Sequence, residues 1–307
     1  MIRVGTRGSK LALAQTYQVI SKLETLGITC EVITIKTTGD LITDRPLVDI
    51  GGKALFLKEI EEHLISHKID IAVHSLKDVP AILLDGLVIQ AVTKRIQSED
   101  VLISYKTLED LPVGATIGTC SSRRKAFLQY NFPNKFNIVD LRGNIDTRID
   151  KFNRGELDGI IIALSGIERL QLKQHITQVI PIEMILPAIG QGVIAVECRQ
   201  DDKKIMQILD SINHRDTYDQ ITAERGFMIE MGGNCKTPIA SLATISNNNI
   251  QLIAAFAVPD GSFIFKEQII GDRHDAHQLG IAIAQKIKNQ MMKSLYFESV
   301  RELFTVN

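Results

Sequence analysis

Apolar residues follow two alternating spacings along the first third of the chain, one typical of helices and one of short buried strands. The stretch from Lys10 to Leu26 has a helical spacing that Gly27 ends, and Phe56, Ile60 and Leu64 mark the apolar face of a second helix. Extended apolar runs lie at Ile2–Gly5, Glu31–Thr37 and Ile69–Ser75. Helices that alternate with short strands predict βαβ units and a mostly parallel sheet.

Part of this pattern is repeated further along the chain. VGTRGSKLALAQ (Val4–Gln15) has a counterpart in IGTCSSRRKAFLQ (Ile117–Gln129), and KIDIAVHSLKD (Lys68–Asp78) has one in ELDGIIIALSGIERL (Glu156–Leu170). Gly and Ser are ordinary loop and cap residues, so chance similarity between βα units is the alternative explanation. Because the two pairs of similar segments occur in the same order, they favour two related α/β lobes that face each other.

The last third of the chain has a different pattern. Ser241–Ile270 contains three short strands divided by Asn-rich and Pro-Asp-Gly turns, and a helix follows from about Asp275 to Met292. Consecutive hairpins with one covering helix predict a small α+β domain with an antiparallel sheet. Before it, Leu186–Arg199 is a glycine-interrupted strand that we expect to cross back to the first lobe.

Composition narrows the class of protein. The chain has 307 residues, 45% hydrophobic and 23% charged, which is typical of a globular protein with two or three domains. Its net charge of −1 argues against a nucleic-acid-binding surface. The sequence shows neither a secretory signal nor a membrane-spanning run, and its four cysteines lie far apart without metal-site spacing. We therefore expect a cytoplasmic protein without a membrane anchor, disulfide framework or metal site.

Six arginines follow predicted strands, where open α/β sheets bind ligands. They are Arg7, Arg123, Arg124, Arg142, Arg148 and Arg169. Expected helix N-termini at Ser9 and Ser122 would add backbone donors. Such a set suits an anion with several carboxylates, whereas arginines that solvate loops and pair with acidic residues are the alternative. Both nucleotide-loop patterns, GxGxxG and GxxxxGK[ST], are absent.

The segment HSLKDVP (His74–Pro80) directly follows a buried strand. Asp78 is the carboxylate that we place in the cationic cleft, where it would stabilise a positive intermediate or donate a proton. An ordinary turn aspartate is the alternative. His74 is interpreted as a buried, hydrogen-bonded strand residue and not as a general base.

Two cysteines are candidates for a reactive thiol. Cys235 follows two glycines in GGNCK and precedes Lys236, while Cys120 lies near a predicted helix N-terminus and two arginines. Both surroundings favour a thiolate, so spacing alone does not choose between them. Cys30 and Cys198 lie among strand residues and fit buried, inert thiols.

Together these motifs resemble one family, hydroxymethylbilane synthase, also called porphobilinogen deaminase. The resemblance runs in order through VGTRGSKLALAQ, KTTGD, GGKALFLKE, DIAVHSLKDVP, GTCSSRRKAFL, LRGNIDTR, LPAIGQG, ECRQDD and GGNCKTPIA. It implies two α/β lobes like those of periplasmic binding proteins and a small α+β C-terminal domain with a three-stranded antiparallel sheet. The implied boundaries are 1–94 with 190–213, 95–189, and 214–307.

The resemblance also implies roles for individual residues. Asp78 corresponds to the catalytic aspartate, and Cys235 to the cysteine that carries a covalent dipyrromethane cofactor. The implied cofactor-binding residues are Ser75, Lys77, Arg123, Arg124 and Arg148. The implied substrate-binding residues are Arg7, Ser9, Arg142 and Arg169.

The implied activity is that of a monomeric transferase of tetrapyrrole (heme) biosynthesis. It would deaminate porphobilinogen and join four units into linear hydroxymethylbilane, with the arginines holding the carboxylates that each unit adds. A non-catalytic binding protein for a small polycarboxylate is the main alternative, although such a receptor needs neither a third domain nor Cys235. A thiol hydrolase is a more distant one, since no histidine has an identifiable orienting partner.

Overall fold

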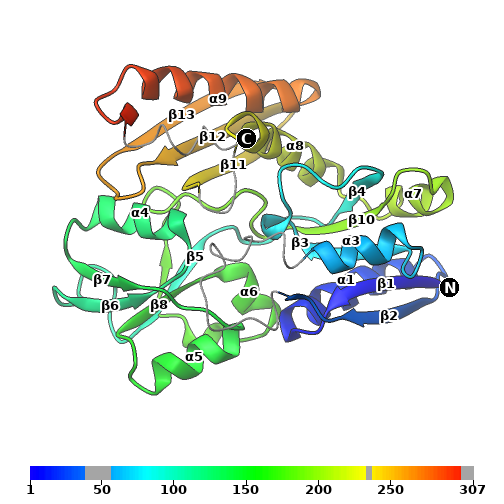
Figure 1. The fold of residues 1–307 in the computed structure, drawn as a ribbon, viewed down its shortest axis with the longest axis horizontal. Coiled ribbons are helices and arrows are strands. Elements are labelled where there is room, and N and C mark those ends of the chain that lie inside the picture. Colours follow the sequence, from blue (N-terminus) through cyan, green and yellow to red (C-terminus); the bar gives the residue numbers. More distant parts are fainter. Residues whose placement is uncertain (39–56, 233–236, 299–307) are drawn as a thin grey trace. The chain divides into compact units, whose positions relative to one another are not determined.

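The computed structural model of the chain describes residues 1–38, 57–232 and 237–298. It consists of two compact units, Met1–Ile96 with Gly192–Tyr218 and Gln97–Gln191 with Asp219–Asn307 (Figure 1). Among the described helices, none is both long and apolar enough to cross a membrane.

The first unit contains a five-stranded sheet in the order β2-β1-β3-β10-β4. β1 pairs in parallel with β2 and β3, whereas β10 runs antiparallel to both of its neighbours. The elements are β1 (Ile2–Arg7), α1 (Lys10–Glu24), β2 (Cys30–Ile35), α3 (Lys58–Ile65), β3 (Ile71–Ser75), the 3₁₀ turn η3 (Leu76–Asp78), β4 (Leu87–Val92), β10 (Ile194–Arg199) and α7 (Lys203–Asp210).

Local sequence explains the start and end of α1. The Ser9 hydroxyl accepts a hydrogen bond from the Ala12 backbone N–H at 3.2 Å and so caps the helix. Val19 and Leu23 are buried in the core, and Gly27, with φ +74°, ends the segment in the left-handed conformation. The predicted helix and its cap are confirmed.

The second unit contains another five-stranded sheet in the order β7-β6-β8-β5-β9. β6 pairs in parallel with β7 and β8, and β5 runs antiparallel to both of its neighbours. Its elements are β5 (Asp100–Ser104), β6 (Ala115–Gly118), α4 (Ser122–Asn131), β7 (Phe136–Val139), α5 (Ile145–Asn153), β8 (Gly159–Ala163), α6 (Leu164–Arg169), the 3₁₀ turn η4 (Lys173–His175) and β9 (Gln178–Ile180).

The two sheets have the same strand order and the same directions, with β1 matching β6 and β3 matching β8. These strands belong to the two pairs of similar sequence segments. The predicted pair of related α/β folds is therefore confirmed at the level of topology. The predicted helix N-terminus at Ser122 is confirmed, since α4 begins there, and the Ser121 hydroxyl caps the helix by accepting a hydrogen bond from the Arg124 backbone N–H at 3.4 Å.

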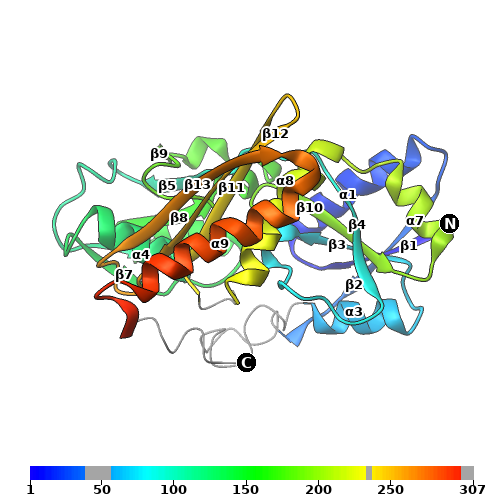
Figure 2. The same cartoon turned by 90° about the horizontal axis from the view of Figure 1, so that it is seen from above.

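The remaining elements of the second unit form a three-stranded antiparallel sheet and its helices. They are α8 (Arg215–Glu230), which begins in the first unit, β11 (Ile239–Ser246), β12 (Asn249–Ala257), β13 (Ile264–Asp272), the 3₁₀ turn η5 (Arg273–Asp275) and α9 (Ala276–Met292). α9 lies along this sheet (Figure 2), and Phe227, Phe256 and Ile283 are fully buried in the shared core. The predicted α+β region is confirmed.

Candidate functional site

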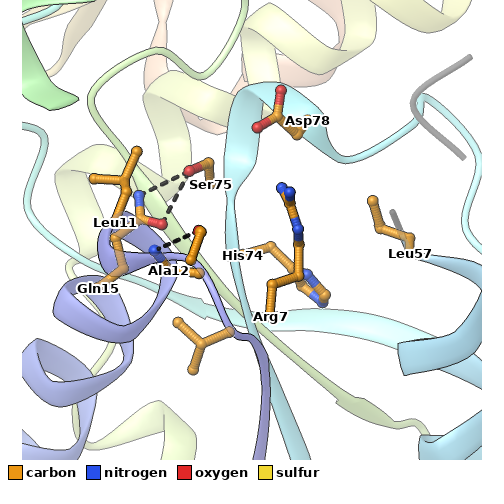
Figure 3. A pocket seen from close by; sticks show the side chains of 10 residues that line it. Arg7, Leu11, Ala12, Gln15, Leu57, His74, Ser75 and Asp78 are labelled. Carbon is orange, nitrogen blue, oxygen red and sulfur yellow. Dashed lines mark hydrogen bonds between the residues drawn. The ribbon is translucent and has the colours of Figure 1, made fainter. Parts of the chain in front are cut away.

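A pocket lies at the carboxyl ends of β1 and β3 in the first unit (Figure 3). Because these strands are parallel neighbours, their ends meet at one edge of the sheet. The pocket is lined by Arg7, Ser9, Leu11, Ala12, Gln15, Leu57, Val73, His74, Ser75 and Asp78. The structure therefore brings together four of the predicted site residues, Arg7, Ser9, Ser75 and Asp78.

Arg7 and Asp78 give this pocket its charge. Arg7 is the last residue of β1 and Asp78 belongs to η3, directly after β3; both are half-buried. Figure 3 shows the Arg7 guanidinium directed toward the side on which the Asp78 carboxylate lies. Asp78 is the one carboxylate among the described residues that line the pocket. Lys77 is half-buried beside it in η3 but does not line the pocket.

Hydrogen bonds fix the wall that α1 contributes. The Gln15 amide donates to the Ser75 hydroxyl at 2.8 Å, and that hydroxyl lies 3.0 Å from the Gln15 carbonyl oxygen. The first turn of α1, all of it described, has no acidic residue. The N-terminus of this helix, with its partial positive charge, thus borders the pocket beside Ser9 and Arg7 and favours an anionic group.

His74 lines the same pocket and is hydrogen-bonded to a buried glutamate. Its Nε2 lies 3.0 Å from Glu197 Oε2, on β10, and both side chains are almost completely buried. The interpretation of His74 as a buried, hydrogen-bonded strand residue is confirmed. This partner could not be predicted from local sequence patterns, because 123 residues separate the two in the chain.

Arg123 and Arg124 lie in the first turn of α4, after β6, and both donate to the buried carboxylate of Asp100 at 2.8 and 2.7 Å. Burial alone would raise the pKa of Asp100. The two guanidinium groups, with hydrogen bonds from Arg124 and Gln191, outweigh this and hold the pKa well below its usual range.

These guanidinium groups are also bound to the backbone. Arg123 donates to the Leu186 carbonyl at 2.6 Å and Arg124 to the Ile161 carbonyl at 2.9 Å. Their Nε atoms are buried without a hydrogen-bond partner in the described part of the chain. Asp100 was not predicted as a partner, although its place at the start of a buried strand made it an unusual aspartate.

The other three predicted arginines follow neighbouring strands of the same sheet. Arg142 lies between β7 and α5, and Arg148, in α5, donates from Nε to the Gly143 carbonyl at 2.8 Å. Arg169 is the last residue of α6, after β8, and burial lowers its pKa to about 10. Together with Arg123 and Arg124, they all come from the carboxyl ends of the adjacent parallel strands β6, β7 and β8.

The described cysteines differ in exposure. Cys198 is fully buried in β10, and burial raises its pKa to about 12; burial also raises the pKa of Cys30. Cys198 fits the predicted buried, inert thiol, whereas Cys30 is only half-buried. Cys120 is exposed before α4. Cys235, the predicted cofactor attachment point, lies outside the described residues.

Comparison with known proteins adds two kinds of similarity. Among solved structures, the chain resembles an ABC transporter periplasmic substrate-binding protein from Coxiella burnetii, with 17% identity, a TM-score of 0.42 and coverage of 69% of this chain and 92% of that chain. It also resembles the methionine-binding protein MetQ, with 15% identity, a TM-score of 0.44 and coverage of 69% and 89%.

Sequence comparison gives closer relatives. The family described as "Porphobilinogen deaminase, dipyromethane cofactor binding domain" matches residues 2–207, and "Porphobilinogen deaminase, C-terminal domain" matches 218–289. The porphobilinogen deaminase of Francisella tularensis subsp. holarctica is 44% identical over 93% of this chain and 95% of its own. That of Syntrophomonas wolfei is 44% identical over 94% and 95%. The chain therefore belongs to the porphobilinogen deaminase family, as the order of its motifs predicted.

Proposed function

We propose that the pocket around Arg7 and Asp78 is where this chain carries out the reaction of its family. The enzyme is a hydroxymethylbilane synthase, a transferase that joins four porphobilinogen units into a linear tetrapyrrole on a dipyrromethane cofactor. The observation that carries the proposal is the single carboxylate of Asp78 among the described lining residues, opposite Arg7 at the carboxyl edge of the sheet.

The side chains present suit dipyrromethane and porphobilinogen, which both carry acetate and propionate groups on pyrrole rings. Arg7, the Ser9 and Ser75 hydroxyls and the N-terminus of α1 provide donors and positive charge for carboxylates. Asp78 provides an acceptor for pyrrole N–H groups. When bound, dipyrromethane supplies the nucleophilic pyrrole carbon to which the first substrate unit is joined.

Asp78 is the proposed catalytic residue. Loss of ammonia from porphobilinogen leaves an electron-poor methylene-pyrrole with cationic character, and a fixed carboxylate beside the ring nitrogen stabilises that charge. Arg7 and Ser9 orient the substrate through its carboxylates, with Arg142 and Arg169 in the same proposed role. Orientation of this kind lowers the entropic cost of bringing the two carbon atoms together.

The proposed cofactor-binding residues are Ser75, Lys77, Arg123, Arg124 and Arg148, and Cys235 is the proposed attachment point. For Arg123 and Arg124, the shared ion pairs with Asp100 support a rigid placement. Cys198 is buried and its pKa is raised, so it is a poor attachment point, and this supports Cys235 as the attachment point instead. Cys120 is the alternative attachment point, because it is exposed.

The remaining proposals concern organisation and location. We propose three domains with the boundaries 1–94 with 190–213, 95–189, and 214–307. We also propose a monomer that acts in the cytoplasm and binds neither nucleic acid nor membranes. Four cysteines without paired spacing support a reducing compartment, and the net charge of −1 argues against a polyanionic partner.

Intact-mass spectrometry of the purified chain tests the attachment of the cofactor. The wild-type mass should exceed the sequence mass by two pyrrole units. Cys235→Ser should lose this increment and the matched variant Cys120→Ser should keep it. A wild-type mass equal to the bare chain contradicts the proposed function, and loss of the increment only in Cys120→Ser assigns the attachment to the other thiol.

Turnover tests the role of Asp78. Asp78→Asn should keep the cofactor mass but reduce turnover by about 100-fold or more, because the amide cannot stabilise a cation as a carboxylate does. Asp85→Asn, at an exposed aspartate outside the pocket, is the control and should retain normal turnover. Near-normal turnover of Asp78→Asn removes this residue from catalysis.

A further inference from the structure

A group of three buried ionisable side chains lies behind the pocket. His74 on β3 and Glu197 on β10 come from neighbouring antiparallel strands. His74 pairs with Ala195, and Glu197 lies two residues beyond Ala195, so both side chains are on the same face of the sheet. Glu61, on α3, is also buried, and α3 contacts both β3 and β10. Of the three side chains, only His74 also lines the pocket.

The carboxylates of this group have unused hydrogen-bonding capacity. Glu197 Oε1 and Glu61 Oε1 are buried without a hydrogen-bond partner in the described part of the chain. An uncompensated pair of buried carboxylates is costly, so such a pair favours holding a proton. Burial, followed by the charge of Glu197, raises the pKa of Glu61 to about 7, which is consistent with a proton held near neutral pH.

The backbone of β10 departs from regular pairing at this point. Its register with β4 shifts between Val196 and Glu197. Irregularities of this kind are common near active sites, where they redirect a side chain. Here the irregularity coincides with the residue that holds the His74 ring.

The charged and polar surroundings of His74 come from five elements. β1 contributes Arg7 and η3 contributes Asp78, both on the pocket side. β10 contributes Glu197, α3 contributes Glu61, and α1 contributes the uncharged Gln15. Nε2 of the ring is taken by Glu197, and no other polar partner of His74 occurs among the described residues. Nδ1 is the ring nitrogen without a hydrogen bond in that part of the chain.

The family reaction requires such an exchange in every cycle. The C–N bond of porphobilinogen breaks and its electron pair leaves with ammonia. When the new C–C bond forms, the attacked pyrrole carbon loses its hydrogen as a proton and the C–H electron pair returns to the ring. One proton per cycle must therefore be accepted near the reacting carbons and passed to the departing ammonia, which leaves as ammonium.

We propose that His74 is the proton carrier of this pocket, oriented by Glu197 and electrostatically coupled to Glu61; this replaces the sequence-based interpretation that His74 does not act as a base. The proposal rests on the proposed function, since it places the reaction in this pocket. Glu197 fixes the ring and stabilises its cationic form, as a buried carboxylate does for a catalytic histidine. Glu61 acts through Glu197 and is a positioning residue.

A spectroscopic measurement tests the coupling without turnover. Imidazole ¹⁵N chemical shifts of His74 are followed against pH in cofactor-loaded wild type, Glu61→Gln and Glu197→Gln, with Glu62→Gln as the control. Glu62 lies on the same helix but is exposed. Because Glu197 contacts the His74 ring, loss of its charge in Glu197→Gln should move the His74 signal change to lower pH. Glu61→Gln should alter the His74 shifts only above about pH 7, where wild-type Glu61 becomes ionised, and Glu62→Gln should leave them unchanged. Unchanged titration in both buried variants overturns the proposed coupling.

Kinetics then test the proton transfer. His74→Gln should lower kcat by about 100-fold with little change in KM, since the ring handles a proton and does not bind the carboxylates. Glu61→Gln, the milder variant, should change the kcat–pH profile only above about pH 7, where wild-type Glu61 is ionised. Retained cofactor mass and circular dichroism establish that the variants fold. Normal kcat in folded His74→Gln overturns the proposal.

The two proposals fail in distinguishable ways. If wild type binds no cofactor or Asp78→Asn keeps full turnover, the proposed function of the pocket is wrong, whatever the NMR result. If Asp78→Asn is inactive while His74→Gln is fully active, the pocket assignment stands and the proton carrier is wrong.

Discussion

At the scale of single residues, Glu61 should make the stability of the chain depend on pH. Its pKa in the folded chain is about 7, above the ordinary value of 4.5, mainly because it is buried. Between these values the folded state binds more protons than the unfolded state. The free energy of unfolding should therefore fall as pH rises through this window, by up to about 3 kcal/mol, and stay lower above it.

Urea unfolding at several pH values from 4.5 to 8 measures this effect. Glu61→Gln has no carboxyl group to titrate at this position, so its stability should lose that part of the pH dependence and exceed the wild-type trend most at pH 8. The comparison of the two proteins cancels the contribution of other titrating groups. Identical slopes for both would show that Glu61 ionises like an exposed glutamate.

Individual partners were harder to predict from sequence than individual site residues. Arg7 and Asp78 were predicted together because both follow strands, and parallel strands bring their ends to one edge. Asp100, the partner of Arg123, and Glu197, the partner of His74, gave no such signal. Pairing across a sheet depends on strand order, which a local sequence pattern does not encode.

At the scale of elements, α8 and α9 pack closely through glycine. A Cβ atom at Gly280 would lie 2.3 Å from the Ala223 carbonyl oxygen and 2.6 Å from the Phe227 backbone nitrogen. Since these are backbone atoms, the helices must move apart to accept a methyl group. Gly280→Ala should destabilise the chain by about 2 kcal/mol or more, although alanine is the better helix former.

Thermal and urea unfolding measure this change. Gln285→Ala on the exposed side of α9 is the matched control and should leave stability nearly unchanged. A Gly280→Ala variant as stable as wild type would mean that the two helices can separate at little cost.

Most elements were predictable because their signals are local. The cap and glycine stop of α1, the hairpins of the last third and the strand before Asp78 all follow from residues adjacent in sequence. The start of α4 at Ser122 was predicted as well, and the neighbouring Ser121 caps it. Phe56 of the predicted second helix lies outside the described residues, whereas Ile60 and Leu64 are buried in α3 as expected.

At the scale of the whole molecule, the repeat was visible in sequence but its full extent was not. The two pairs of similar sequence segments matched β1 with β6 and β3 with β8. The structure extends the correspondence to an antiparallel strand in the fourth position of each order, β10 in one sheet and β5 in the other. These two strands occupy different places along the chain relative to the rest of their sheets, so a search for repeats in the same order cannot pair them.

The position of β10 has a consequence for the order of assembly during synthesis. β4 pairs in its sheet only with β10 among the described strands, and β10 separates it from β3. Residues 194–199 leave the ribosome about a hundred residues after β4, once the strands of the second sheet have been made. The N-terminal sheet thus stays incomplete while the second sheet is translated, and it is completed only after β10 has been synthesised.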